Sequence, residues 1–190
     1  MGAVEVNGYT IEPGAFLRGA KLSATSLVGA NLDGAWLSWA NLEEANLEGA
    51  HLEGAVLLGA NLEGAVLLGA NLEGAHLEGA NLEGAHLEEA MLIRARMAGT
   101  LLVRANLDRA NLHGARVPGA NLHGARLRGA NLEYTNPIRA NLEGADLERA
   151  RLSYTNLERA RLIGANLSGS QAVRTTFANA NLEEIGRAHV

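Results

Sequence analysis

The segment that decides the fold spans residues 40–64 and reads ANLEEANLEGAHLEGAVLLGANLEG. Within it, Leu returns at every fifth position, and an Ala stands two positions before each Leu. The same register continues in both directions, from Leu17 to Leu182, as 34 repeats without a phase break. Leu occupies 29 of the 34 centres, so one five-residue unit builds nearly the whole chain. The other centres are Met97, Val117, Pro137, Ala172 and Phe177.

A repeat of five residues fits neither an α-helix nor a straight β-strand. On a helix, five residues turn the chain by roughly 500°, so the Leu side chains would scatter around the axis. In a straight strand, the odd step would place successive Leu side chains on opposite faces. Most of the 23 Gly residues stand immediately before the small residue, where a bend with positive φ suits them. The repeat therefore predicts short extended segments, joined by turns, that coil around a Leu column with three, four or five segments per coil.

Composition limits the kind of protein that this coil can be. Hydrophobic residues make up 47% of the chain but aromatic residues only 4%, so the core must consist of Leu and Ala. The absence of Cys excludes a disulfide framework and thiolate metal sites. No apolar run approaches the length of a membrane span, and the first residues lack the pattern of a signal peptide. We expect a cytoplasmic protein without a membrane partner.

The repeat resembles a known family. Units such as Ala60–Gly64 and Ala140–Gly144, which read ANLEG, are similar to those of the pentapeptide repeat family, and the similarity covers about nine tenths of the chain. The resemblance implies an all-β fold, a right-handed quadrilateral β-helix with four repeats per coil. The 34 repeats would then form about 8.5 coils, each four repeats long. The A-N-L form is most similar to cyanobacterial members, for which the resemblance implies no particular activity.

Three segments are expected along the chain. Residues 1–14 form an N-terminal cap, because an alternating pattern surrounds Asn7-Gly8, a strong hairpin signal. Residues 15–184 form the β-helix, and residues 185–190 form a C-terminal tail. A stack of coils needs both ends covered, and the C-terminal end has no evident cap. We therefore expect a homodimer through the C-terminal end.

Two centres interrupt the pattern of Leu. Pro137 cannot donate a ladder hydrogen bond, so a local bulge is expected there. Ala172 is smaller than the Leu it replaces, which predicts a small cavity or a shifted side chain. We interpret both as structural irregularities and not as sites.

The chain offers no constellation of catalytic or metal-binding residues. With four repeats per coil, His76 and His86 lie on opposite faces, as do His113 and His123, so neither pair can share an ion. The Ser residues stand at outward positions without a paired base, and a solid interior leaves no cleft. The sequence thus predicts a protein that is not an enzyme and holds no cofactor or metal.

Charge is distributed unevenly behind the net value of -5. Residues 41–90 contain ten Glu and no Lys or Arg, whereas residues 91–130 contain seven Arg and one Asp. With four repeats per coil, two columns of like charge arise, one of Glu43, Glu63 and Glu83 and one of Arg96 and Arg116. Such columns are candidates for a partner surface. Duplication explains them as well, because residues 52–61 and 62–71 are the same LEGAVLLGAN.

Aromatic side chains provide a second candidate surface near the N-terminus. Phe16 and Trp36 occupy the same outward position one coil apart, and Trp39 stands close to the following corner. Exposed Trp residues are enriched at protein interfaces. Alternatively, the cap folds over these rings and hides them.

These observations favour a non-enzymatic rod that presents a charged surface to a protein partner whose identity is unknown. The resemblance also suggests an alternative, a DNA mimic that binds DNA gyrase and protects it from inhibitors through the acidic stretch from Glu43 to Glu89. The arginines that follow this stretch and the near absence of Phe at the centres argue against it. Direct nucleic-acid binding is not expected, because the arginines spread over all four faces. A second alternative is a designed or idealised repeat scaffold.

Overall fold

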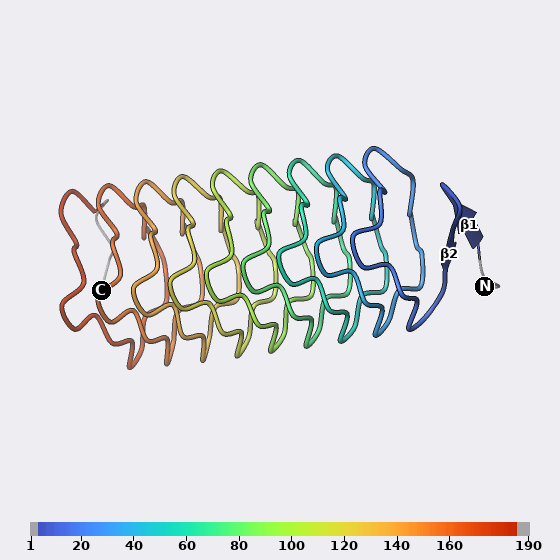
Figure 1. Ribbon diagram of the computed structural model, residues 1–190. Helices are drawn as coiled ribbons and strands as arrows, with labels where there is room; N and C mark the ends of the chain where they lie inside the picture. The colour runs from blue at the N-terminus through green and yellow to red at the C-terminus, as the bar shows by residue number, and fades with distance from the viewer. Residues whose placement is uncertain (1–3, 186–190) are drawn as a thin grey trace.

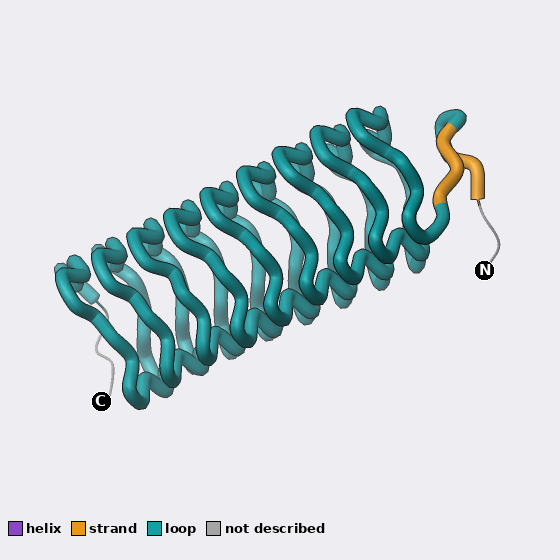
Figure 2. The backbone as a smooth tube through the Cα atoms, turned by 60° about the horizontal axis from the view of Figure 1, so that its bottom comes forward, coloured by secondary structure: helices purple, strands orange, loops and turns teal. Residues whose placement is uncertain are grey.

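The chain forms a straight rod of stacked coils with a hairpin at its N-terminal end (Figures 1 and 2). The computed structural model describes residues 4–185. Strands β1 (Val4–Val6) and β2 (Tyr9–Ile11) pair antiparallel. After the hairpin, single-residue parallel bridges join each outward position to the one four repeats later, such as Phe16 with Trp36. Four repeats therefore complete one coil, which settles the number of sides that the repeat alone leaves open.

Backbone hydrogen bonds join each coil to the coils before and after it. In the repeat around Leu62, the Asn61 N–H donates to the Ala40 carbonyl at 2.9 Å and the Leu62 N–H donates to the Asn81 carbonyl at 2.7 Å. The Gly64 N–H donates to the Glu83 carbonyl at 2.9 Å. Nearly every repeat makes the same bonds, so backbone polar groups are satisfied although the coils contain no long strand.

Each repeat ends in a corner residue with left-handed backbone conformation. Gly64 has φ of 62°, which costs Gly little. The same conformation holds where the corner is not Gly, as at Trp39 (φ 61°), Arg94 (φ 56°) and Tyr134 (φ 59°). The geometry of the coil therefore overrides residue preference at these corners, at a cost of roughly 1–2 kcal/mol each.

Leu and Ala fill the interior. The Leu centres from Leu32 to Leu62 and the Ala residues between them are fully buried. Occasional Thr residues replace Ala without leaving a polar group unpaired, since the Thr100 hydroxyl donates to the Leu77 carbonyl at 2.9 Å. The core is thus continuous and solid, as the composition requires.

The hairpin covers the N-terminal end of this core. Ile11 is buried, and Val6 and Tyr9 pack against the first coil. The Lys21 N–H donates to the Tyr9 hydroxyl at 3.3 Å, and the Asn7 side-chain amide donates to the Lys21 carbonyl. These contacts attach the hairpin to the end of the rod and not to its side.

The ladder is interrupted at Pro137. Within the described residues, the bridges along this face stop at Arg116 and resume at Asn156. Pro has no N–H to donate, and a cavity of about 10 Å³ lies against its ring. This volume is close to the smallest that holds one water molecule.

The C-terminal end opens gradually to solvent. Leu167 is buried, but Phe177 is only partly buried and Leu182 is 37% exposed. Ala172 lies exposed in this last coil, so the cavity expected beneath it is not enclosed, because no complete further coil covers it. Of the tail predicted at 185–190, residues 186–190 lie outside the described residues.

A pair of substitutions tests the packing at the corners. A Cβ at Gly59 would overlap the Trp39 ring, whereas at Gly79, in the same corner column, nothing lies within 4 Å. Both glycines have positive φ, so Gly59→Ala and Gly79→Ala should each lose roughly 1 kcal/mol of stability. Only Gly59→Ala should also displace Trp39 and change its fluorescence emission. Equal emission spectra for the two variants in the folded state would contradict the packing described here.

Candidate functional site

The outward side chains lie on four flat faces. Faces 1 to 4 are defined by residues 16–18, 21–23, 26–28 and 31–33 and by the equivalent positions of each later coil. A corner column separates each face from the next, and a column runs from Gly19 through Trp39 and Gly59 between faces 1 and 2. Faces 2 and 4 therefore flank face 1.

The N-terminal half of face 1 carries an exposed aromatic patch. Phe16 is 86% exposed and Trp36 is 52% exposed, and their rings stack with centroids 6.0 Å apart. Trp39 lies on the adjoining corner, 65% exposed, over Gly59. The hairpin packs on the end of the rod and leaves these rings uncovered, so of the two arrangements considered above the exposed one is present.

The acidic column lies on face 2, along the edge next to the corner that holds Glu44 and Gly64. Glu43, Glu63 and Glu83 line a hollow of about 300 Å³ together with Glu44 and Arg104. Its far end is partly neutralised, because Arg104 Nη2 lies 3.8 Å from Glu83 Oε1. Glu43 and Glu63 have no cationic partner among the described residues.

Several arginines pair with carboxylates of the preceding coil. Arg96 Nε lies 2.7 Å from Glu78 Oε1, and Arg151 Nη2 lies 2.7 Å from Glu133 Oε2. In both pairs the arginine follows the acid in the sequence by slightly less than one full coil. The two side chains therefore lie next to each other on adjacent coils. The same step joins Arg126 with Asp108 and Arg161 with Glu143. The order is reversed between Arg128 and Asp146, where the acid belongs to the following coil.

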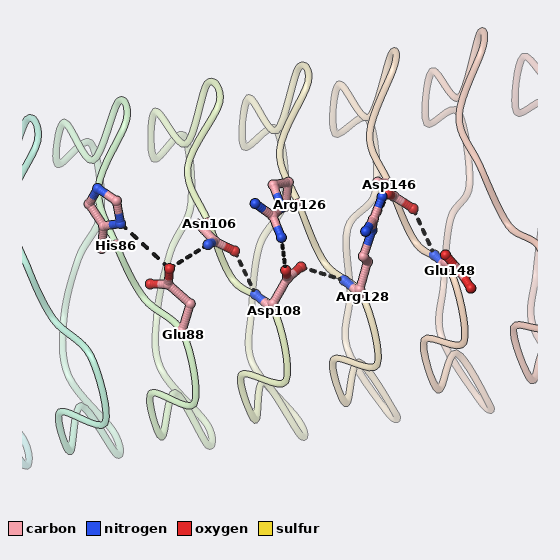
Figure 3. A network of polar contacts seen from close by, with 8 residues as sticks. All are labelled: His86, Glu88, Asn106, Asp108, Arg126, Arg128, Asp146 and Glu148. Carbon is pink, nitrogen blue, oxygen red and sulfur yellow. Dashed lines mark hydrogen bonds and ion pairs between the residues drawn. The ribbon is translucent and has the colours of Figure 1, made fainter.

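On face 3 these pairs join into one polar network that crosses successive coils (Figure 3). Asp108 accepts from the Arg126 guanidinium and from the Arg128 N–H at 3.0 Å. Desolvation alone would raise the pKa of Asp146, but hydrogen bonds from Arg128, from the Glu148 N–H and from Asn166 outweigh it and hold that pKa below its usual value. The hydrogen bond to Asp146 in turn raises the pKa of Arg128. The two arginines of this network pair with Asp108 and Asp146, and its other two carboxylates, Glu88 and Glu148, contact His86 and Arg149.

The charges that remain unpaired are segregated. Among the described residues, the arginines without a carboxylate within 4 Å all lie on face 1 or on its two corners. They are Arg18, Arg94, Arg116, Arg139 and Arg174. The acids without an arginine or histidine partner lie between Glu5 and Glu73, apart from Glu183 and Glu184 in the last coil. The unpaired arginines and the unpaired acids are therefore separated more sharply than the acidic and basic blocks of the sequence.

Two tyrosines, which the sequence analysis did not single out, form a stack on the corner between faces 4 and 1. Tyr134 and Tyr154 lie parallel with centroids 4.7 Å apart. The edge of His113 contacts Tyr134, and the Arg174 guanidinium lies 5.6 Å from the centre of the Tyr154 ring. The signal was present, because the two tyrosines stand at the same repeat position one coil apart. Both residues stay open to solvent, with Tyr134 54% and Tyr154 42% exposed.

The structure brings the predicted surface residues onto two adjacent faces. Phe16, Trp36, Arg96 and Arg116 lie on face 1, and Glu43, Glu63 and Glu83 lie on face 2, with Trp39 on the corner between them. Pro137 lies beneath face 1, and Ala172 belongs to the last coil. In the part of the chain that is described, no three His, Cys, Asp or Glu side chains converge on a metal position. Over the same residues, no helix has the length and apolar character to cross a membrane.

Comparisons with known proteins agree with this architecture. The family model described as Pentapeptide repeats matches 8 copies, at residues 13–38, 37–74, 67–108, 105–136 and 140–183. HetL, a pentapeptide repeat protein involved in heterocyst differentiation regulation in the cyanobacterium Nostoc sp. strain PCC 7120, is 37% identical. The match covers 91% of this chain and 83% of HetL with a TM-score of 0.86. This superposition confirms the expected right-handed quadrilateral β-helix.

The structure of QnrB1, a plasmid-mediated fluoroquinolone resistance protein, is 20% identical. That match covers 75% of this chain and 79% of QnrB1, with a TM-score of 0.46. Among curated proteins, none matches the chain.

The face 3 network predicts a pH dependence of stability. Because folding lowers the pKa of Asp146, its contribution is present above the unfolded pKa of about 3.9 and is lost as the pH falls through the folded pKa. Asp146→Asn should lower the Tm by a few degrees at most at pH 7, since Arg128 is half exposed, and the difference from the parent should vanish near pH 2. Glu73→Gln, which removes a carboxylate without a cationic partner, is the control. A Tm difference for Asp146→Asn that stays constant between pH 7 and pH 2 would contradict the assignment.

Proposed function

The chain belongs to the pentapeptide repeat family, and from this premise we propose that it is a non-enzymatic interaction protein of the cytoplasm. In this proposal, the rod holds side chains at fixed spacing, and a protein partner recognises faces 1 and 2. The solid Leu and Ala core supports the proposal, because catalytic groups need an enclosed cleft in which to converge, whereas the hollow beside Glu43 and Glu63 lies on the surface.

One observation carries the proposal, namely the presence of two unlike exposed surfaces on the adjacent faces 1 and 2. The aromatic patch of Phe16, Trp36 and Trp39 supplies the kind of anchor that dominates binding energy at interfaces. Glu43 and Glu63, on face 2, supply charge that no cation of the described chain neutralises. Apolar anchors flanked by charge are typical of a protein interface, in which the charges select and orient the partner.

The likeness to HetL supports a regulatory role for such binding. HetL is involved in the regulation of heterocyst differentiation, and the similarity covers most of both chains. We extend to this chain only the class of role, a regulator that acts through protein contacts. The homodimer through the C-terminal end stays part of the proposal, supported by the partial exposure of Leu182.

Gyrase mimicry is the weaker alternative, because the acidic surface is short. Three of the ten Glu residues in 41–90 pair with arginines of later coils, and these are Glu78, Glu83 and Glu89. The carboxylates without a cationic partner therefore extend along only a few coils, whereas the phosphates of a DNA duplex continue at regular spacing.

Site-specific photocrosslinking in cells tests the proposed surface. A photoreactive amino acid at Ser38 on face 1 should give a defined adduct with a protein, and Trp36→Ala should abolish this adduct, because it removes the anchor. The same amino acid at Ser168 on face 3, an equivalent position of the repeat, is the matched control. Absence of a defined adduct from Ser38, or equal adducts from both positions, would refute the proposal.

A gyrase assay tests the alternative. The protein at micromolar concentration should neither inhibit DNA supercoiling nor protect gyrase from a quinolone. If it does either, and if the triple substitution Glu43→Gln, Glu63→Gln and Glu83→Gln removes the effect, the acidic column is a DNA mimic and the function proposed above is wrong.

A further inference from the structure

We propose that the C-terminal half of face 1, together with its two corners, binds a short acidic segment of the protein partner, an extended run of Asp and Glu residues. This inference rests on the proposed function, because it gives the chemistry of one part of the same partner. It concerns a different region from the aromatic patch, so the crosslink at Ser38 and the experiment below can fail independently.

This half of face 1 is basic although the chain as a whole is acidic. Its outward and corner positions carry six arginines, namely Arg94, Arg96, Arg116, Arg139, Arg159 and Arg174. At the same positions Glu158 is the one carboxylate, and Arg159 Nε lies 3.6 Å from its Oε1. Arg96 pairs with Glu78 of the preceding coil. The other four arginines have no carboxylate within 4 Å in the described chain, so carboxylates of a partner would complement them.

The tyrosine stack holds one of these charges in place without neutralising it. The Arg174 guanidinium lies 5.6 Å from the centre of the Tyr154 ring, and this ring stacks on Tyr134. Such a contact orients a guanidinium group and leaves its positive charge available. Neither tyrosine hydroxyl makes a hydrogen bond within the described chain, and both residues are exposed. Each hydroxyl can therefore donate to a carboxylate.

The face between these corners offers an amide that can recognise a peptide backbone. The Asn side chains that precede a buried centre commonly accept from the N–H two residues later, as Asn156 accepts from the Glu158 N–H at 3.1 Å. Asn136, which precedes Pro137, is exposed and makes no such bond within the described chain. An amide both donates and accepts, so it matches a peptide group better than it matches a phosphate.

The length of the basic surface favours a short partner segment. Arg94 and Arg174 stand four coils apart. At about 4.8 Å per coil they are about 19 Å apart along the rod, which an extended peptide covers with about six residues. In the earlier coils, carboxylates without a cationic partner in the described chain line the same corner, at Asp33, Glu53 and Glu73. A nucleic acid that continued along the rod would meet these carboxylates, so a short acidic peptide complements the surface better.

Fluorescence anisotropy with the full chain tests this inference. The probe is fluorescein-labelled hexaglutamate, and labelled hexaglutamine is the uncharged control. Hexaglutamate should bind with a Kd on the order of 100 μM in about 50 mM salt and roughly tenfold more weakly in about 500 mM salt, because exposed charges are screened. Hexaglutamine should not bind.

A matched pair of double variants assigns the binding to face 1. Arg116→Asn/Arg139→Asn removes two unpaired charges from this face and should weaken hexaglutamate binding roughly tenfold. Arg126→Asn/Arg149→Asn makes the same change of net charge at the equivalent repeat positions of face 3 and its corner. Both arginines of the second variant already contact acids, so its affinity for hexaglutamate should stay within about twofold of the parent.

Both variants should fold, since Asn already occupies a face position at Asn156 and a corner at Asn179. Equal losses of affinity in the two variants would show that only net charge matters and would overturn the inference. Absence of hexaglutamate binding at protein concentrations up to about 1 mM would also overturn it. Tighter binding of labelled hexathymidylate that is lost in the face 1 variant would replace the peptide by a nucleic acid. None of these results tests the aromatic patch, and the proposed function fails only if the Ser38 crosslink is absent or unspecific.

Discussion

The hydrogen bond between backbone groups of successive coils is the constraint on which the rest of the structure depends. It joins residues about one coil apart along the chain, as between Leu62 and Asn81 or Asn61 and Ala40, and it recurs at nearly every repeat. A coil is too short to contain a strand of its own, so this bond satisfies most of the outward-facing peptide groups. Bonds within the repeat satisfy others, such as the Ala65 N–H to the Leu62 carbonyl and the Glu63 N–H to the Asn61 side chain. The step of four repeats therefore becomes a fixed distance, and positions in the sequence translate directly into positions on a surface.

The surface charges follow from this lattice. An arginine that precedes the buried centre of its repeat contacts an acid that follows a buried centre in the preceding coil, as Arg96 contacts Glu78. Such pairs are individually weak because they are exposed. Their larger consequence is that few charges remain without a partner. Among the described residues these are the arginines of face 1 and its corners, Lys21, the acids between Glu5 and Glu73, and Glu183 and Glu184 in the last coil. Neither the net charge nor the acidic and basic stretches of the sequence show where the unpaired charges lie on the rod.

The sequence predicts the interior better than the surface. The five-residue period requires a coil around Leu, and the structure places Leu32 to Leu62 at the centre as expected. The period alone leaves the number of sides open, because any polygon returns Leu to the interior. The pairing of arginines with acids of the preceding coil was not foreseen, since it depends on how far an Arg side chain extends along the rod. The stack of Tyr134 and Tyr154 was also missed, although its spacing of one coil was visible.

The corner arginines bear on whether the surface is selected or is a remnant of duplication. Each corner holds a left-handed conformation that suits Gly, so an Arg there costs roughly 1–2 kcal/mol of strain. At Arg109 an ion pair with Glu89 at 3.1 Å offsets part of that cost. Arg139 has the same backbone strain, at φ of 58°, without an ion pair in the described chain. Copying of repeats would have preserved Gly at such corners, as it did at Gly64 and Gly74. Strained residues that return no stability are most simply explained by a contact outside the chain, and Arg139 borders the one face on which the unpaired arginines gather.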